Sequence, residues 1–366
     1  MIFERTEIIS VALQILFSTN SSILRKLKER EITPEEIFSM DQRELSEIGM
    51  KESNQELILT GKIFKIAEEE LYNAEKIGAR VISYDDENFP PLLREIQDPP
   101  RCLYIKGDSD LLKIPSIAIV GTRNFSPYGK NVAERISSDL AERGLVVVSG
   151  LARGIDSIAH KAAIGKGKTI GVLGCGIDIV YPKENKSLMV ELEKKGVVIS
   201  EFPLGTPPFS QNFPVRNRTI SGISYGVVVI EASIRSGSLI TAGYALDQGR
   251  EVMAVPGNIT SELSRGTNFL IKSGAKLVET WEDVVEELPH RIREQFLIKK
   301  EKIEIELTQD ESKIFEILKS DEATPIDEIS VKTGIPVFIL HSHLLNLELK
   351  GAIIQNPGKT FQKKLL

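Results

Sequence analysis

The sequence predicts a Rossmann-like α/β fold with a doubly wound, mostly parallel sheet, flanked by a small helical N-terminal domain and a C-terminal winged helix. Near-continuous apolar runs alternate with helical patterns through the middle of the chain. Apolar residues recur at helical spacing from Ile8 to about Ala79. Three more helical patterns after residue 306 lead into a short β-prone segment. Each of these three observations predicts one part of the architecture.

Six apolar runs in the middle of the chain predict the strands of the sheet. They span residues 117–120, 145–148, 169–173, 197–200, 227–230 and 252–255. Strands that are apolar on both faces and alternate with helices form parallel sheets covered on both sides. Ligands of such sheets bind at the carboxyl ends of the strands, so the turns after these runs are the candidate site.

The chain is expected to divide into four segments. Residues 1–80 form the helical domain, in which the turn at 45–50 faintly resembles a helix-hairpin-helix, and residues 81–288 form the extended α/β domain. The charged stretch 289–306 shows little apolar periodicity and is predicted to be a linker. Residues 307–366 have the order of a winged helix-turn-helix. Its helices are expected at 310–319, 325–333 and 337–350.

Composition excludes a membrane protein and a disulfide-rich secreted one. No stretch approaches ~18 consecutive apolar residues. The N-terminal residues lack the short apolar core and cleavage site of a signal peptide. Cys102 and Cys175 are the only cysteines, which suits a reducing compartment. A cytoplasmic location without membrane contact is therefore expected.

The net charge of −6 is unevenly distributed along the chain. Residues 1–80 carry 11 Lys and Arg against 15 Asp and Glu, residues 115–285 carry 19 against 16, and residues 306–366 carry 7 against 9. Only the middle segment is net positive. The electrostatic footprint of a nucleic-acid partner is therefore expected there.

The first candidate turn follows the run at 117–120 and contains Gly121, Thr122 and Arg123. Ser126 followed by Pro127 is typical of a helix start. The free N–H groups of that helix would favour an anion, and Arg123 would add donors matched to phosphate oxygens. A structural turn with a solvated arginine is the alternative.

The second candidate turn contains Ser149, Gly150, Ala152, Arg153 and Gly154. Its glycines permit the backbone to approach a ligand closely. Asp156 is expected to cap or orient this turn rather than to act as a base, because no second carboxylate or histidine stands at a paired position nearby in sequence.

The third candidate is a predicted loop with Phe213, Arg216, Asn217 and Arg218. Bases stack on aromatic rings while guanidinium groups take phosphates, which is what single-strand binding requires. The alternative is a surface loop anchored by a buried Phe213.

The fourth candidate is the segment with Gly237 and Ser238, which is expected to begin a helix whose N-terminus offers N–H and hydroxyl donors. Four anion-binding turns on one sheet edge would form a groove rather than a single pocket.

Motifs for nucleotide cofactors and metals fail on inspection. Residues 162–169 end in Gly-Lys-Thr, but Ala162 replaces the first glycine of a P-loop and the segment leads from a helix into a strand. His341 and His343 have no acidic or cysteine companions in sequence. We therefore expect no cofactor, no metal and no catalytic residue.

Taken together, these turns closely resemble the DNA-processing protein A family (DprA, also called Smf). The motifs are Gly121-Thr122-Arg123, the 149–156 turn, Phe213-Pro214 with Arg216-Asn217-Arg218, and the 236–242 segment, followed by Val255-Pro256-Gly257. Their order and spacing match over the whole chain. Thr122 departs from the serine of many members but keeps the hydroxyl. The resemblance implies a SAM-like helical domain, a Rossmann domain and a winged helix.

The resemblance also implies a function without enzymatic activity. Family members bind and protect single-stranded DNA and load the RecA recombinase onto it in natural transformation. The implied DNA contacts add Lys168 to the turns above. The implied partners are single-stranded DNA, RecA and a second copy of the chain, with the homodimer interface around Asn268, Phe269, Ile271 and Leu277.

Two other functions stay open on the residues alone. A Rossmann-like nucleotide hydrolase or phosphoribohydrolase could use Glu231 as a base beside Gly237. A transcription factor could act through residues 307–366, although the net acidity of that segment disfavours duplex binding.

Overall fold

The computed structural model describes residues 3–17, 21–297, 307–319, 323–350, 352–356 and 358–363. By its internal contacts the chain divides into two compact units, Met1–Leu297 and Ile298–Leu366, and each is described by itself. Among the described residues, no helix has both the length and the apolar character needed to cross a bilayer.

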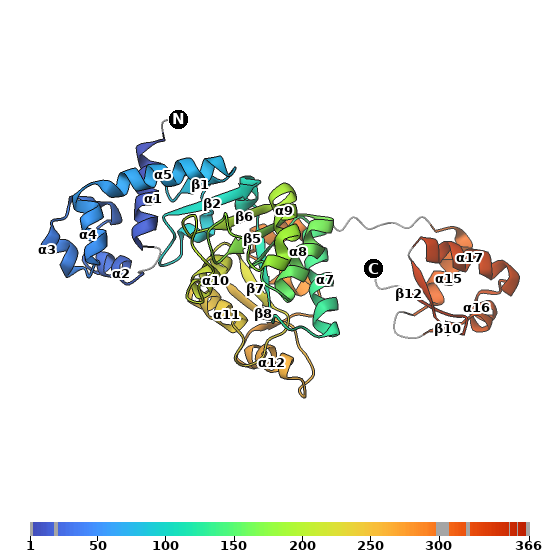
Figure 1. The fold of residues 1–366 in the computed structure, drawn as a ribbon. Coiled ribbons are helices and arrows are strands. Elements are labelled where there is room, and N and C mark those ends of the chain that lie inside the picture. The colour runs from blue at the N-terminus through green and yellow to red at the C-terminus, as the bar shows by residue number, and fades with distance from the viewer. Residues whose placement is uncertain are drawn as a thin grey trace. The chain divides into compact units, whose positions relative to one another are not determined.

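A nine-stranded sheet forms the centre of the first unit (Figure 1). Its strands are β1 (Arg80–Ser83), β2 (Cys102–Gly107), β3 (Ser116–Val120), β4 (Val146–Ser149), β5 (Thr169–Leu173), β6 (Val197–Ser200), β7 (Gly226–Val229), β8 (Glu251–Ala254) and β9 (Lys276–Leu277). The order is β1-β2-β6-β5-β4-β3-β7-β8-β9. Pairing is parallel from β6 to β9 and antiparallel for β1 and β2. The six predicted runs coincide with β3 to β8 within one residue, so the predicted sheet is confirmed.

The strand order reverses at β3, which lies between β4 and β7. The chain runs from β3 through β4 and β5 to β6 on one side, and returns to place β7 and β8 on the other. The connections after β3 and β7 therefore diverge, and a crevice opens at the carboxyl ends of these two strands. This reversal fixes where a ligand site can form.

Helices cover both faces of the sheet. One layer contains α7 (Pro127–Glu142), α8 (Ile155–Lys166), α13 (Trp281–Glu286) and α14 (His290–Leu297). The other contains α6 (Pro91–Arg94), α10 (Asn212–Gly222), α11 (Ser238–Asp247) and α12 (Arg265–Lys272). Ile117 belongs to the core of the first layer and Ala118 to the core of the second. Successive strand residues face opposite layers, which is why the apolar runs are nearly continuous.

The N-terminal helices share a core with one end of the sheet. They are α1 (Arg5–Phe17), α2 (Ser21–Glu29), α3 (Gln42–Glu47), α4 (Glu52–Leu59) and α5 (Lys62–Lys76). Leu16 and Leu71 join the same cluster as Tyr104 of β2 and Leu192 of α9 (Lys186–Lys195). The predicted helical region therefore packs directly on the sheet.

The second unit has the predicted winged-helix order. It contains α15 (Gln309–Ile317), β10 (Thr324–Pro325), α16 (Ile326–Thr333), α17 (Val337–Leu349), β11 (Ile353–Asn356) and β12 (Thr360–Lys363). Its strands pair as β10-β12-β11. The segment predicted as a linker, 289–306, is not a linker in its first part. Residues His290–Leu297 form α14, which buries Phe296 in the core between the sheet and its first helix layer. The rest of that segment, 298–306, lies outside the described residues.

Candidate nucleic-acid interface

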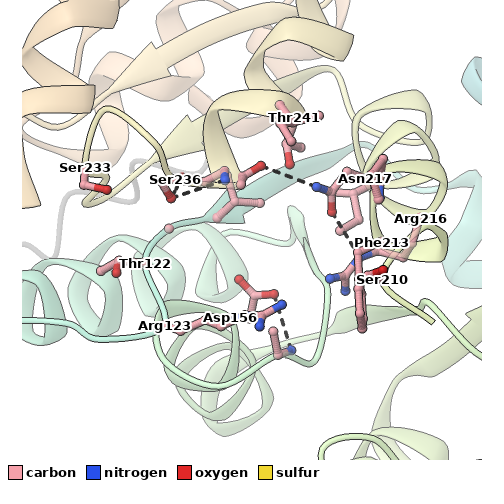
Figure 2. Close-up of a pocket in the computed structure, with 18 residues that line it drawn as sticks. Thr122, Arg123, Asp156, Ser210, Phe213, Arg216, Asn217, Ser233, Ser236 and Thr241 are labelled. Carbon is pink, nitrogen blue, oxygen red and sulfur yellow. Dashed lines mark hydrogen bonds between the residues drawn. The ribbon is translucent and has the colours of Figure 1, made fainter. Parts of the chain in front are cut away.

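A pocket of about 470 Å³ lies at the carboxyl ends of β3 and β7, where the strand order reverses. Its walls come from three of the predicted turns and from α10. The predicted site residues that line it are Gly121, Thr122, Arg123, Ala152, Phe213, Arg216, Asn217, Gly237 and Ser238. Figure 2 shows Thr122, Arg123 and Asp156 across the pocket from Ser236 and Thr241.

The loop after β4 forms one wall and is held by its own hydrogen bonds. The Asp156 carboxylate accepts the backbone N–H groups of Gly150 at 3.2 Å and of Ala152 at 3.4 Å. Asp156 therefore orients the turn, as expected from the sequence. Gly154 has a φ of 82°, and a Cβ there would lie 2.3 Å from the Thr122 carbonyl oxygen. Only glycine allows this turn to pack against the turn after β3.

Arg216 places a buried positive charge at the base of the pocket. Its side chain donates to the carbonyl oxygens of Val172 at 3.1 Å and of Gly150. Burial raises the pKa of the neighbouring Asp156 carboxyl, and the Arg216 charge opposes that rise. Arg216 therefore compensates a buried carboxylate while it also lines the pocket.

Arg123 and Phe213 meet at the mouth of the pocket. The guanidinium carbon of Arg123 lies 5.6 Å from the centroid of the Phe213 ring. The Arg123 side chain is exposed, and no acidic partner among the described residues pairs with it. Phe213 is half-buried, and its ring centroid lies 5.7 Å from that of Tyr181. An aromatic face and an exposed cation therefore stand together at one opening.

The N-terminus of α11 closes the opposite side of the pocket. Gly237 occupies the N-cap position, and the Ser236 and Ser238 hydroxyl oxygens are 2.8 Å apart. A Cβ built on Gly237 would meet no atom within 4 Å beyond its chain neighbours. The predicted helix start at Ser238 is confirmed, and Ser236 and Ser238 both line the pocket.

The N-terminus of α7 is not open to a ligand, contrary to expectation. Ser126 is the N-cap and Pro127 the first helical residue, as predicted. However, the Glu231 carboxylate accepts both the backbone N–H of Ser126 at 2.9 Å and its hydroxyl at 2.5 Å. A Cβ on Gly129 would lie 2.1 Å from Glu231 Oε2, so the carboxylate fits only because that residue is glycine. An anion does occupy this helix end, as predicted, but it is the Glu231 carboxylate of the protein and not a bound phosphate.

Glu231 is buried and its carboxylate is committed to α7. A general base needs an oxygen within reach of the proton that it removes. Because both oxygens are bound to Ser126 and Glu231 does not line the pocket, this geometry does not favour the hydrolase alternative.

The third predicted site segment is a helix and not a loop, because Phe213, Arg216 and Arg218 all belong to α10. Pro214 falls in the first turn of α10, where a missing N–H costs nothing. The helical geometry separates the two arginines. Arg218 pairs with the buried Glu201 at 2.8 Å and lines a different cavity of about 380 Å³.

Five other predicted residues also do not line the pocket: Gly150 and Gly154, described above with the loop after β4, and Arg153, Lys168 and Ser149. Arg153 is exposed and pairs with Glu184. Lys168 precedes β5 at the amino end of the strand and donates to the Lys195 carbonyl oxygen at 3.0 Å. The buried Ser149 hydroxyl donates to the Ile119 carbonyl oxygen at 2.7 Å and so ties β4 to β3.

Sequence reasoning missed several residues that shape the site. Ser210 and Thr241 line the pocket, and Asn185 Nδ2 donates to the Leu151 carbonyl oxygen at 2.7 Å. Thr241 lies one helical turn after Ser238, so the spacing of the predicted helix could have found it. Asn185 comes from a distant loop, and no local signal marks it.

The residues predicted for a dimer interface are exposed in part. Phe269 on α12 is 54% exposed and Leu277 on the edge strand β9 is 40% exposed. Ile271 packs partly into the core of the α12 layer. The side chain of Asn268 exchanges hydrogen bonds with the backbone of Gly257 at 3.2 and 3.0 Å.

Comparison with known proteins covers both units. A family described as DNA recombination-mediator protein A matches residues 80–289, and the DprA winged helix domain matches residues 299–359. Protein Smf of Escherichia coli strain K12 is 42% identical over 299 residues, which are 80% of either chain. The DNA processing protein DprA of Bacillus subtilis strain 168 is 46% identical over 216 residues, or 58% of this chain and 73% of the relative.

Two solved structures are similar to the chain. DNA processing protein A from Streptococcus pneumoniae has a TM-score of 0.65 and 36% identity, and the match covers 79% of this chain and 99% of that one. DNA processing protein A from Helicobacter pylori, whose structure was described for its single-stranded DNA binding mode, has a TM-score of 0.53 and 31% identity over 58% of this chain and 97% of that one. A family match over more than half of the residues and a relative 42% identical across four fifths of them show that this chain belongs to the DNA recombination-mediator protein A family, DprA or Smf.

Proposed function

We propose that this chain binds single-stranded DNA in the pocket at the carboxyl ends of β3 and β7, without catalysing a reaction. The meeting of Arg123 and Phe213 at the mouth of the pocket carries the proposal. Single-strand binding combines a cationic groove for the backbone with an aromatic platform for bases. The H. pylori relative, described for binding single-stranded DNA, supports the same ligand here.

The contacts divide into two kinds. Arg123 is exposed and would neutralise a phosphate, whereas Phe213 would stack on a base. Arg216 would add charge from below, and the hydroxyl groups and N–H groups at the start of α11 would bind phosphate oxygens. Gly150 and Gly154 shape the wall, while Arg153, Lys168 and Arg218 would contact only DNA that extends beyond the pocket.

A salt titration tests this division. Each phosphate contact to a single strand releases roughly 0.7 counterion, so Arg123→Ala should flatten the log–log salt dependence of binding by about that amount. Arg135→Ala on α7, which removes an exposed arginine outside the pocket, should leave the slope unchanged. A slope unchanged in Arg123→Ala, with the fold intact by circular dichroism, would refute the phosphate contact.

Phe213→Ala supplies the second arm of the same experiment. Loss of stacking should weaken binding by about 1–3 kcal/mol while the salt slope stays the same, because no counterion is involved. If Phe213 acts only as an anchor of α10, its truncation lowers the melting temperature together with binding. Thermal unfolding of the variant therefore distinguishes the two roles.

We also propose that the bound strand is handed to the RecA recombinase, in DNA uptake by natural transformation and in homologous recombination. The description of the family as recombination mediators supports this step. RecA filament assembly on single-stranded DNA should be faster with the protein than without it. Arg123→Ala should lose that acceleration in proportion to its loss of DNA binding.

A further inference from the structure

The outward face of α17 carries an apolar stripe that the core of its unit does not use. Phe338, Leu345 and Leu349 are 78%, 56% and 77% exposed. Leu340, Leu344 and Leu347 on the opposite face are buried in the unit's core. At 3.6 residues per turn, the three exposed side chains project within a sector of about 40°. A contiguous exposed apolar surface of this kind marks an interaction site.

The spacing of the stripe is that of a helix-pairing face. Phe338, Ser342, Leu345 and Leu349 follow one another at intervals of four, three and four residues, and all four are exposed. Alternation of four and three is the a/d repeat by which two helices pack side by side. We call these four residues the α17 seam.

The charge of α17 argues against DNA as the occupant of the seam. The helix contains no Lys or Arg from Val337 to Leu349, and Glu348 is its only acidic residue. A helix that binds a duplex needs a positive face to displace counterions from the phosphates. The seam instead matches an apolar surface with the same repeat.

We propose that the α17 seam pairs with the α17 seam of a second copy of this chain, with the two helices antiparallel. In that arrangement each Phe338 faces the other copy's Leu349, and each Ser342 faces the other copy's Leu345. The seam is therefore complementary to itself under a two-fold axis. A parallel pair would set Ser342 against Ser342 and leave a polar layer at the centre.

The size of the seam sets the strength of the contact. With an aromatic side chain burying about 150–250 Å², the seam of one copy offers about 400 Å² and the pair buries about 800 Å². Stable interfaces bury about 1,200 Å² or more, so the pairing is weak between free copies. Tethering several copies on one DNA strand raises their effective concentration and therefore the fraction of seams that pair. This last step rests on the proposed single-strand binding.

Cysteine cross-linking of the full-length protein tests the pairing. Cys102 and Cys175 are buried, so Ser342→Cys gives a single exposed thiol for a short bismaleimide reagent. On an oligonucleotide long enough for several copies, this protein should form a covalent dimer. Val331→Cys, which exposes a thiol on α16, is the matched control and should cross-link at least about tenfold less, because tethering brings both thiols equally close but only the paired seam holds its thiols together.

A charge exchange in the Ser342→Cys background tests the orientation. Leu349→Glu or Phe338→Lys alone should reduce cross-linking about tenfold, because each places a charge in an apolar layer. An equimolar mixture of the two should restore it, since the antiparallel pair sets the carboxylate introduced into one copy against the ammonium group introduced into the other. Both positions are exposed in the single chain, so melting temperatures should not change.

Several outcomes would overturn the pairing. Cross-linking that persists in the single charged variants, or that is not restored in the mixture, removes the antiparallel seam. If the single charged variants cross-link as well as the parent but retain duplex DNA less well, α17 binds a DNA duplex instead. Failure of the parent to bind a short single-site oligonucleotide would refute the proposed function instead, and cross-linking at high protein concentration without DNA would still decide the pairing.

Discussion

His160 is a buried histidine whose hydrogen bonds fix the loop beneath the pocket. The Thr169 hydroxyl donates to the Val147 carbonyl oxygen at 2.7 Å, so it can only accept from His160 Nδ1, also at 2.7 Å. His160 Nε2 is then free to accept the Leu151 N–H at 3.3 Å. Leu151 has a φ of 54°, which non-glycine residues adopt only when their surroundings hold them there. The neutral ring of His160 provides one of those contacts.

The pH dependence of stability should report on His160. Burial lowers its pKa from 6.5 to about 3. Between these values the unfolded chain binds more protons than the folded one, so His160 stabilises the fold fully above pH 6.5 and progressively less as the pH falls. The loss is at most about 1.4 kcal/mol per pH unit in that window. It should be measured as the unfolding free energy in urea at several pH values.

His160→Gln is the variant for comparison, because its amide does not titrate. Its unfolding free energy should fall less between about pH 6.5 and about pH 4.5 than that of the parent. Asp156 titrates in both proteins, and burial raises its pKa, so its contribution cancels in the difference. Equal slopes for the two proteins would contradict the assignment.

Arg216 and Arg218 show what the residue types predict and what they leave out. The sequence predicts that arginine side chains lie beside the Phe213 ring, and Arg216 does line the pocket together with Phe213. Two positions apart on a helix is about 200° of rotation, so Arg218 points to the other side of α10. In a loop, both side chains could have lined one pocket. The prediction of a loop was wrong, and in the helix only Arg216 lines the pocket.

At the scale of elements, the strands were predictable because each is apolar on both faces, and the start of α7 because Ser126 and Pro127 mark it. The anion at that helix end was not predictable. Glu231 follows β7, 105 residues after Ser126, and only the β3–β7 pairing brings the two together. Local sequence patterns determine where a helix begins, whereas the order of strands in the sheet determines which distant residue contacts that helix terminus.

The exposed side chains of α12 and β9 carry a prediction about self-association. Phe269 and Leu277 leave an apolar surface at one edge of the sheet, and we expect a homodimer there. Phe269→Glu with Leu277→Glu should give the mass of a monomer in sedimentation velocity. Ile271 is a poorer choice for substitution, because it packs partly into the core and a charge would disturb the fold.

Leu246→Glu on α11 is the matched control for that pair, since it adds a charge at another exposed apolar residue of the same layer. It should leave the dimer intact. A dimer that survives the double substitution would place the interface elsewhere.

At the scale of the molecule, the pocket belongs entirely to the first unit. Deleting residues 300–366 should therefore leave the affinity for a short single-stranded oligonucleotide nearly unchanged. The deleted segment is also net acidic and would repel the DNA backbone if it acted at all. Fluorescence anisotropy with the full and shortened chains measures this. A loss of more than about tenfold, equivalent to about 1.4 kcal/mol, would place DNA contacts in the winged helix.

The position of β3 between β4 and β7 has a consequence for synthesis on the ribosome. β3 ends at Val120, and its neighbour β7 begins at Gly226. At about 5–20 residues per second, roughly 5–20 s pass between the emergence of these two strands. During that interval the β3 edge is an open strand, apolar from Ile117 to Val120, without its partner. A nascent chain stalled before β7 would present that edge to chaperones, and would do so before the pocket at the ends of β3 and β7 exists.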